Sequence, residues 1–140
     1  MGKHRSRCPM NHAVEILGDQ WTLLVVRDMI FHAKNSFSEL SEMPEGIATN
    51  ILTDRLNRLE ASGIIEKRVD SHDARKRNYS LTRHGLGLIP VLLELMVWSR
   101  DHTSDVDVTH AVTKKIKRDR EAAVVEIRDR LKQASSLARD

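Results

Sequence analysis

Short polar side chains recur at helical spacing within the segment 46–63, GIATNILTDRLNRLEASG. They are Thr49, Asn50, Thr53 and Asn57, and the apolar residues Ile51, Leu52, Leu56 and Leu59 fall on the other side. Asparagine amides can pair with adenine edges, and threonine can hydrogen-bond bases or phosphates and touch thymine methyl groups. The pattern therefore predicts a helix that reads the major groove of DNA.

Charged residues on the same helix suit the DNA backbone. Arg55 and Arg58 lie toward the edge of the apolar face, where they can contact phosphates. Asp54 would be repelled by phosphates unless it accepts a hydrogen bond from a cytosine amino group or pairs with Arg58 four residues on. We favour the pair with Arg58.

A strongly basic segment follows directly. From Glu66 to Arg83 there are six Lys or Arg residues and three acidic residues. Residues 64–69 and 78–82 have strand character, and the polar stretch between them is predicted to form a projecting loop. On this hairpin we predict DNA contacts from Arg68, Arg75, Lys76 and Arg77. A solvated face that binds nothing is the alternative, but the polar helix just before it favours an anionic polymer.

Four helices are expected to position these residues, over 9–18, 20–32, 37–43 and 46–63. Asp19 can cap the second helix, and the segment Ser36–Glu39 has the pattern of a capping box before the third. Pro44 ends the third helix, and Gly63 suits the left-handed position after the fourth. A short helix, a turn with glycine and a second helix with a polar face form a helix-turn-helix.

The C-terminal part of the chain is also predicted to be helical. A long helix over 84–102 precedes a polar break, and the stretch 109–139 carries apolar residues three or four apart with a gap around Arg120. We interpret this stripe as a contact with a second subunit; folding back on its own domain is the alternative. The expected division is a DNA-binding domain at 1–102 and a dimerisation helix at 103–140.

Length and composition bound the class of protein. With 140 residues, 31% charged and 40% apolar, the chain suits one globular domain and has no apolar run near the roughly 18 residues of a membrane span. No signal peptide is evident. The seven histidines are scattered without metal-ligand spacing, and the carboxylates form no motif with a base or nucleophile, so no metal, cofactor or enzyme activity is expected.

Cys8 is the one cysteine, which excludes an internal disulfide and suits a reducing cytoplasm. It precedes Pro9 at the expected start of the first helix, with Arg5 and Arg7 nearby, so the helix dipole and the local charge favour the thiolate. Any disulfide must join Cys8 of two subunits or join Cys8 to a small thiol. A small residue packed at a dimer interface is the alternative interpretation.

A set of motifs in a fixed order spans about residues 8–100. They are Cys8-Pro9, Gly18-Asp19-Gln20-Trp21-Thr22, Phe37-Ser38-Glu39-Leu40, Gly46-Ile47, Leu52-Thr53, Leu56, Leu59-Glu60, Gly63-Ile64, Tyr79-Ser80-Leu81-Thr82, Gly85 and Pro90-Val91-Leu92 through Trp98. Each motif is weak alone, but together and at this spacing they make the sequence similar to the HxlR-type winged-helix transcription regulators, relatives of the MarR group.

The chain departs from the family pattern at three places. Asp19 and Gln20 stand where the family usually has Gly-Lys. Ala48 replaces the usual serine and removes a side-chain cap, at a cost of about 1 kcal/mol unless Thr49 takes over. The wing reads Asp73-Ala74-Arg75, which resembles the MarR wing, where the acid orients an arginine directed into the minor groove.

The resemblance implies a mainly α fold with a small β-hairpin, a winged helix-turn-helix whose N- and C-terminal helices form a dimer interface. It implies a homodimeric regulator of transcription that binds double-stranded DNA in the cytoplasm, on the nucleoid. Two recognition helices about 34 Å apart predict a near-palindromic operator. A winged helix used only for protein contact is the alternative, and it would make the basic wing dispensable.

The resemblance also suggests a signal. In this family a cysteine at the place of Cys8 often senses oxidants or electrophiles. A small-molecule effector is the other candidate signal, with Trp21 and Trp98 as lining residues, although tryptophans at helical spacing among leucines more often belong to the core.

Overall fold

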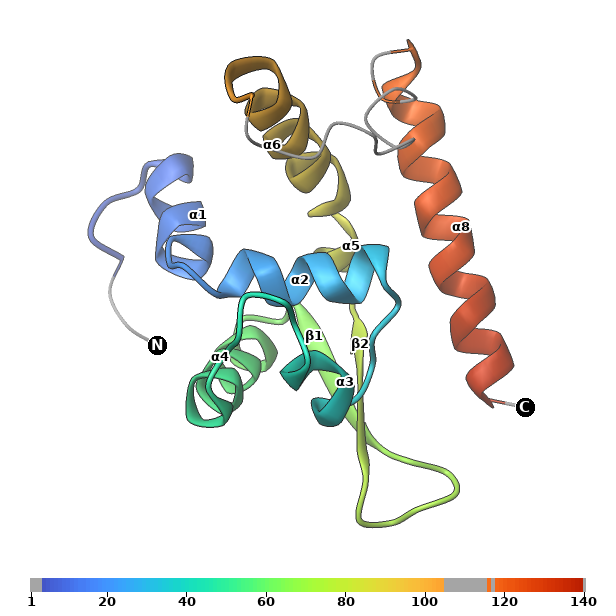
Figure 1. Cartoon of the computed structure of the whole chain (residues 1–140). Helices are drawn as coiled ribbons and strands as arrows, with labels where there is room; N and C mark the ends of the chain where they lie inside the picture. The colour runs from blue at the N-terminus through green and yellow to red at the C-terminus, as the bar shows by residue number, and fades with distance from the viewer. Residues whose placement is uncertain (1–3, 105–115, 117, 140) are drawn as a thin grey trace. The chain divides into compact units, whose positions relative to one another are not determined.

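The computed structural model describes residues 4–104, 116 and 118–139. Its contacts divide the chain into two compact units, one ending at Thr82 and the other beginning at Arg83. The first unit contains α1 (Pro9–Leu17), α2 (Thr22–Phe31), α3 (Phe37–Ser41), α4 (Thr49–Ala61), β1 (Ile65–Val69) and β2 (Arg77–Leu81) (Figure 1). The second contains α5 (Arg83–Leu86), α6 (Ile89–His102) and α8 (Arg120–Arg139). The mainly helical chain with one two-stranded hairpin confirms the predicted fold class.

The predicted capping side chains of Asp19 and Ser36 both accept from backbone N–H groups at the start of a helix, although α2 begins at Thr22 rather than at Gln20. The Asp19 carboxylate accepts hydrogen bonds from the backbone N–H groups of Trp21 and Thr22 at the start of α2. The Ser36 hydroxyl accepts from the Glu39 N–H at the start of α3 and donates to the Glu39 carboxylate. Both caps satisfy N–H groups that have no partner within the helix.

The end of α4 is set by Gly63, which has a φ of +75°. The Gly63 N–H donates to the carbonyl of Glu60, and the Ile64 N–H donates to the carbonyl of Leu59. This pair of bonds is a Schellman motif, which requires the left-handed backbone that glycine adopts without steric cost. The predicted role of Gly63 is thus confirmed, and the chain turns sharply from α4 into β1.

The core of the first unit lies between α2, α3, α4 and the start of the hairpin. Its fully buried side chains include Val25, Val26 and Ile30 of α2, Leu40 of α3, Leu52, Leu56 and Leu59 of α4, and Ile64 and Ile65. α4 packs against α2, α3 and β1, so its apolar side faces inward as predicted. Burial of these aliphatic groups holds the polar side of α4 outward.

The hairpin is antiparallel, with Ile65 opposite Leu81 and Val69 opposite Arg77. A bridge between Ser36 and Asn78 and a 2.7 Å hydrogen bond from the Tyr79 N–H to the Asn35 carbonyl attach β2 to the segment before α3. The hairpin is therefore fixed to the helix-turn-helix on one side, while its connecting loop extends beyond the helices of the first unit (Figure 1).

The second unit differs from the single helix predicted over 84–102. α5 ends at Leu86, and α6 begins at Ile89 with Pro90 in its first turn. Because proline has no N–H, Pro90 cannot donate to the Leu86 carbonyl and its ring crowds that carbonyl, so one helix cannot pass through this point. Pro90 instead occupies a helix start, where its N–H is not needed.

α8 begins at Arg120, at the gap in the apolar pattern of the stretch 109–139. The Asp119 carboxylate accepts from the Ala122 N–H and caps the helix, and Arg120 Nε lies 2.7 Å from Glu94 Oε1 of α6. Residues 109–115 and 117 of that predicted stretch lie outside the described residues. The division expected near 103 stays a prediction, whereas the contacts divide the chain after Thr82.

Candidate nucleic-acid interface

The turn between α3 and α4 is held by an ion-pair network from α2. Arg27 donates from both terminal nitrogens to the Glu45 carboxylate, at 2.7 and 2.8 Å, and from Nε to Asp28 at 2.9 Å. The pKa of Glu45 falls to about 2, chiefly because of the Arg27 hydrogen bonds. Lys34 Nζ lies 2.9 Å from the other oxygen of Asp28, which is fully buried. Two cations thus compensate one buried acid, and the network fixes the turn that leads into α4.

Gly46 completes this turn. Its φ is +76°, and its N–H donates to the Met43 carbonyl at 3.0 Å. A Cβ placed on Gly46 would meet no atom within 4 Å, so the backbone conformation rather than space demands glycine here. The two glycines that bound the 46–63 segment therefore act in the same way, as left-handed residues at either end of α4.

The four polar residues predicted to read DNA are all exposed on α4. They are Thr49, Asn50, Thr53 and Asn57. The Thr53 hydroxyl donates to the Thr49 carbonyl at 2.9 Å, so its oxygen can still accept a hydrogen bond. The structure thus brings these side chains together on one face, and their contact with DNA stays a prediction.

Ala48 stands at the N-cap of α4, as the sequence predicts. Its φ of −70° and ψ of 145° are those of a cap residue, and no side-chain cap is made there. The N–H groups of the first turn that a serine would satisfy are therefore left to water or to a ligand. A DNA phosphate is one ligand that such N–H groups can bind.

The two arginines of α4 have different environments. Arg58 is 54% exposed, and its Nη1 lies 3.9 Å from Asp54 Oδ2. Arg55 is only 19% exposed; its Nε donates to Asp19 Oδ1 at 3.0 Å and its Nη1 donates to Asp54. Asp54 therefore pairs with Arg55 more closely than with the predicted partner Arg58. Of the two arginines, Arg58 is the more accessible to a DNA phosphate.

Asp70 organises the loop of the wing, a role that the sequence analysis missed. Its carboxylate accepts from the N–H groups of His72 and Asp73 and from the side-chain amide of Asn78, at 2.8 to 3.1 Å. The Asn78 bond is the largest cause of a lowered pKa for Asp70. The only local signal in the sequence was an aspartate directly after a predicted strand, a common start for a turn.

The wing cations predicted to contact DNA are Arg68, Arg75, Lys76 and Arg77, and all four are exposed. Arg68 pairs with Glu66 at 2.8 Å, and Arg77 donates to the carbonyl of Ala74 at 2.9 Å. Arg75 is 93% exposed and is held by Asp73, whose carboxylate accepts from its backbone N–H. The contact between Asp73 and Arg75 agrees with the MarR-like Asp-x-Arg pattern, and entry of Arg75 into the minor groove stays a prediction.

Cys8 is exposed and stands at the N-cap of α1, where its carbonyl accepts from the His12 N–H. The preceding arm is attached to α1 by Glu15, which accepts from the Arg5 N–H at 2.9 Å and lies 2.6 Å from His4 Nδ1. These contacts, the Arg5 bond first among them, lower the pKa of Glu15 to about 2. The thiol is thus accessible at the start of a helix whose N-terminal arm is fixed.

Tryptophan placement differs between the two units. Trp21 is half-buried at the start of α2. Trp98 is 62% exposed on α6 and stacks on His102, with ring centroids 5.5 Å apart. The expectation that Trp98 belongs to the core is therefore wrong for the single chain, because Leu92 and Leu93 face inward in its place.

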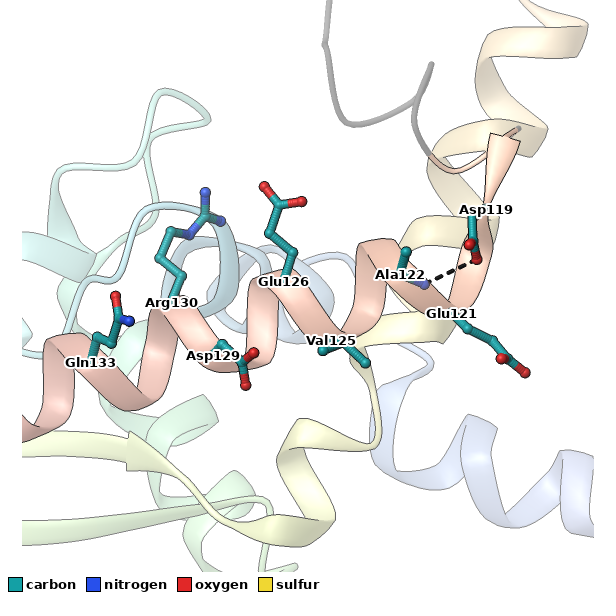
Figure 2. Close-up of a pocket in the computed structure, with 8 residues that line it drawn as sticks. All are labelled: Asp119, Glu121, Ala122, Val125, Glu126, Asp129, Arg130 and Gln133. Carbon is teal, nitrogen blue, oxygen red and sulfur yellow. Dashed lines mark hydrogen bonds between the residues drawn. The ribbon is translucent and has the colours of Figure 1, made fainter.

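A shallow surface lies on α8. Figure 2 shows that its lining side chains all come from this helix and its start, among them Asp119, Val125 and Arg130. A surface made by one helix cannot enclose a ligand in the way that a cleft does. Within residues 4–104, 116 and 118–139, no three His, Cys, Asp or Glu side chains are grouped closely enough to hold a metal ion.

Residues 16–107 match the family described as HxlR-like helix-turn-helix. Over 88 residues the chain is 35% identical to sll1512 of Synechocystis sp., an uncharacterized HTH-type transcriptional regulator. This match covers 63% of the chain and 64% of the Synechocystis protein, just under two thirds of its length.

Solved structures show the same fold. PA1607, a candidate transcription factor, matches with a TM-score of 0.66 and 31% identity over 76% of this chain and 73% of its own. The reduced form of the transcriptional regulator YodB from B. subtilis matches with a TM-score of 0.59 and 29% identity, over 73% of this chain and all of its own. YodB has also been solved with quinone bound.

Proposed function

This chain belongs to the HxlR-like helix-turn-helix family of transcriptional regulators, and we propose that it binds a specific site on double-stranded DNA as a homodimer. The family consists of regulators rather than enzymes. Such a protein works where the chromosome is, so the proposal places it in the cytoplasm, on the nucleoid. Its target is a near-palindromic operator with half-sites about one helical turn, or roughly 34 Å, apart.

One observation carries the DNA-binding proposal: the exposed polar face of α4 lies in the same compact unit as a wing whose four cations are exposed. Asn50 and Asn57 supply amides for base edges, while Arg58 and the wing supply charge for phosphates. The hydrogen bond from Tyr79 to Asn35 attaches the wing to the segment that begins α3. The wing is thus hydrogen-bonded to the helix-turn-helix that contains α4. This attachment lets α4 and the wing contact one DNA duplex together.

Exposed apolar side chains support the homodimer. Met10 and Val14 of α1 are 69% and 41% exposed, and Val91, Leu95 and Trp98 of α6 are also exposed. On α6 these three lie at i, i+4 and i+7, so they form one stripe along the helix. Large apolar groups gathered on one helix face are typical of a subunit contact. We propose that these residues of α1 and α6 take part in the subunit contact together with the C-terminal stretch 103–140, which the sequence analysis assigns to dimerisation.

The proposed signal is oxidation or electrophilic modification of Cys8. The thiol is accessible at the N-terminus of α1, and YodB, a structural relative, has a quinone-bound form. Since the chain contains one cysteine, oxidation would join the Cys8 residues of two subunits or join Cys8 to a small thiol. A small-molecule effector at the subunit contact is the second candidate signal.

A binding titration tests the function. The fluorescently labelled duplex upstream of the gene is titrated with protein in parallel with a duplex of random sequence at the same salt concentration. We expect tighter binding to the upstream duplex, with two subunits per site. Equal affinity for the two duplexes would exclude sequence-specific recognition of that region. Failure to bind either duplex would favour the alternative, a winged helix used only for protein contact.

A further inference from the structure

Asp19 links the start of α2 to the recognition helix. Its carboxylate accepts from the Trp21 and Thr22 N–H groups and from the Thr22 hydroxyl, and it also accepts from Arg55 Nε at 3.0 Å. We propose that Asp19 is a positioning residue for DNA recognition, and that Arg55 holds α4 against the start of α2 instead of contacting a phosphate. This inference rests on the proposed DNA-binding function.

The contrast between Arg55 and Arg58 supports this assignment. Arg55 is 19% exposed and donates to two carboxylates, those of Asp19 and Asp54. Arg58, on the same helix, is 54% exposed and has only a 3.9 Å approach to Asp54. Two carboxylates offset the single charge of Arg55 and occupy its Nε and one terminal nitrogen. A phosphate could use only the remaining donors, on a guanidinium whose charge the two carboxylates already offset.

The position of Asp19 is itself restrained. The Asp19 N–H donates to the Leu17 carbonyl at 2.9 Å, and the Gly18 N–H donates to the Val14 carbonyl at 2.7 Å. A Cβ on Gly18 would lie 2.4 Å from the Val14 carbonyl oxygen, so the chain between α1 and α2 passes closely over the end of α1. The Asp19 carboxylate also accepts the N–H groups at the start of α2. If Arg55 moved, the carboxylate could keep its contact with Arg55 only by breaking these bonds or by moving the start of α2. Arg55 is thereby attached to a fixed point.

The charge state of Asp19 is consistent with a permanent link. Partial burial opposes its ionisation, but hydrogen bonds from the Thr22 hydroxyl, from the Trp21 and Thr22 amides and from Arg55 outweigh burial and lower its pKa to about 2. The carboxylate is therefore anionic at neutral pH. Removal of the Asp19 charge should therefore change DNA affinity in a direction that distinguishes electrostatic repulsion from a positioning role. An anion near DNA repels phosphates, so its removal alone would tighten binding, whereas loss of a positioning contact would weaken it.

The experiment measures affinity for the upstream duplex as a function of salt in Asp19→Asn, Arg55→Gln, the double variant and the matched control Arg58→Gln. Asparagine can still accept the N–H bonds of Trp21 and Thr22, so Asp19→Asn removes the negative charge that faces Arg55 while it retains most of the cap. We expect each single variant at 19 and 55 to bind about fivefold more weakly, and the double variant to be no weaker than Arg55→Gln. The two single variants, Asp19→Asn and Arg55→Gln, should leave the slope of log affinity against log salt unchanged. Arg58→Gln should reduce the magnitude of that slope by about 1.

Two results would overturn the inference while DNA binding stands. The first is that Asp19→Asn binds as tightly as the wild type or more tightly. The second is that Arg55→Gln reduces the salt slope as Arg58→Gln does, which would make Arg55 a phosphate contact. Arg55→Gln leaves the α2 cap intact, so its salt slope decides the question even if Asp19→Asn unfolds. A wild-type protein that fails to bind the duplex would overturn the proposed function and this inference together.

Discussion

The Asp73 carboxylate accepts a hydrogen bond from the backbone N–H of Arg75 at 2.9 Å, and the same oxygen lies 3.4 Å from Arg75 Nε. The acid thus restrains both the main chain and the guanidinium of a side chain that is 93% exposed. At this exposure the terminal nitrogens of Arg75 are accessible to a DNA phosphate or base edge. Restraint of this kind reduces the conformational entropy that an arginine loses on binding.

Replacement of Arg75 by alanine is expected to weaken DNA binding and to reduce its salt dependence. Loss of one cationic contact should lower the magnitude of the salt slope by about 1. Binding is measured by fluorescence anisotropy across a series of salt concentrations. Lys67→Ala is the matched control, because Lys67 is a cation of the same hairpin that lies 3.9 Å from Glu60 and is outside the predicted contact set. An unchanged affinity and slope for Arg75→Ala would remove the wing tip from the interface.

Ala48→Ser should stabilise the protein. Ala48 already has the backbone conformation of an N-cap, so a serine hydroxyl there can accept from the uncapped N–H groups of α4. We expect the free energy of unfolding to rise by about 1 kcal/mol, measured by urea denaturation. Ala61→Ser, at the other end of the same helix, should give no comparable gain. A stability unchanged by Ala48→Ser would mean that water already satisfies these groups equally well.

Glu45 should make folding stability depend on pH in the acid range. Its pKa in the folded protein is about 2, below the ordinary value of 4.5, chiefly because Arg27 hydrogen-bonds its carboxylate. The stabilisation is therefore fully present above pH 4.5 and is lost as the pH falls through about 2. Denaturation at a series of pH values should show a steeper loss for the wild type than for Glu45→Gln. Because the pair is partly exposed, high salt should reduce this difference, and identical pH profiles at low salt would contradict it.

Oxidation of the protein with diamide should produce a species of twice the chain mass on a non-reducing gel. In this reaction two Cys8 thiols lose two protons and two electrons, which diamide takes up, and one S–S bond forms. If Cys8 carries the signal, the DNA affinity of the wild type changes with oxidation while that of Cys8→Ser does not. Equal affinities with and without oxidant in both proteins would leave Cys8 as a residue of the subunit contact only.

Structural features that depend on interactions between residues close in the sequence could be predicted from the sequence. The Ser36 cap acts on a residue three positions away, and Gly63 acts on the helix that it ends, so both were predicted from neighbouring residues. The polar face of α4 followed from helical spacing alone. The same locality explains the Asp73–Arg75 contact, which joins residues two positions apart.

Features that depend on tertiary packing were missed or placed differently. Asp28 lies within an apolar stripe of α2, and only the folded chain brings Lys34 and Arg27 against its two oxygens. Arg55 was predicted to contact phosphate from its position at the edge of the helix. Its pairing with Asp19, 36 residues earlier, depends on how α4 packs against α2.

The central claim is that the exposed face of α4 reads a DNA sequence, and footprinting of the upstream duplex tests it most directly. We expect the wild-type protein to protect two half-sites whose centres lie about 10 base pairs apart. Asn50→Ala should lose protection at the operator, at a cost of about 1–3 kcal/mol in specific binding, and should bind random duplex almost as well as before. Loss of specific and random binding to the same extent in Asn50→Ala, or wild-type protection without paired half-sites, would contradict the account.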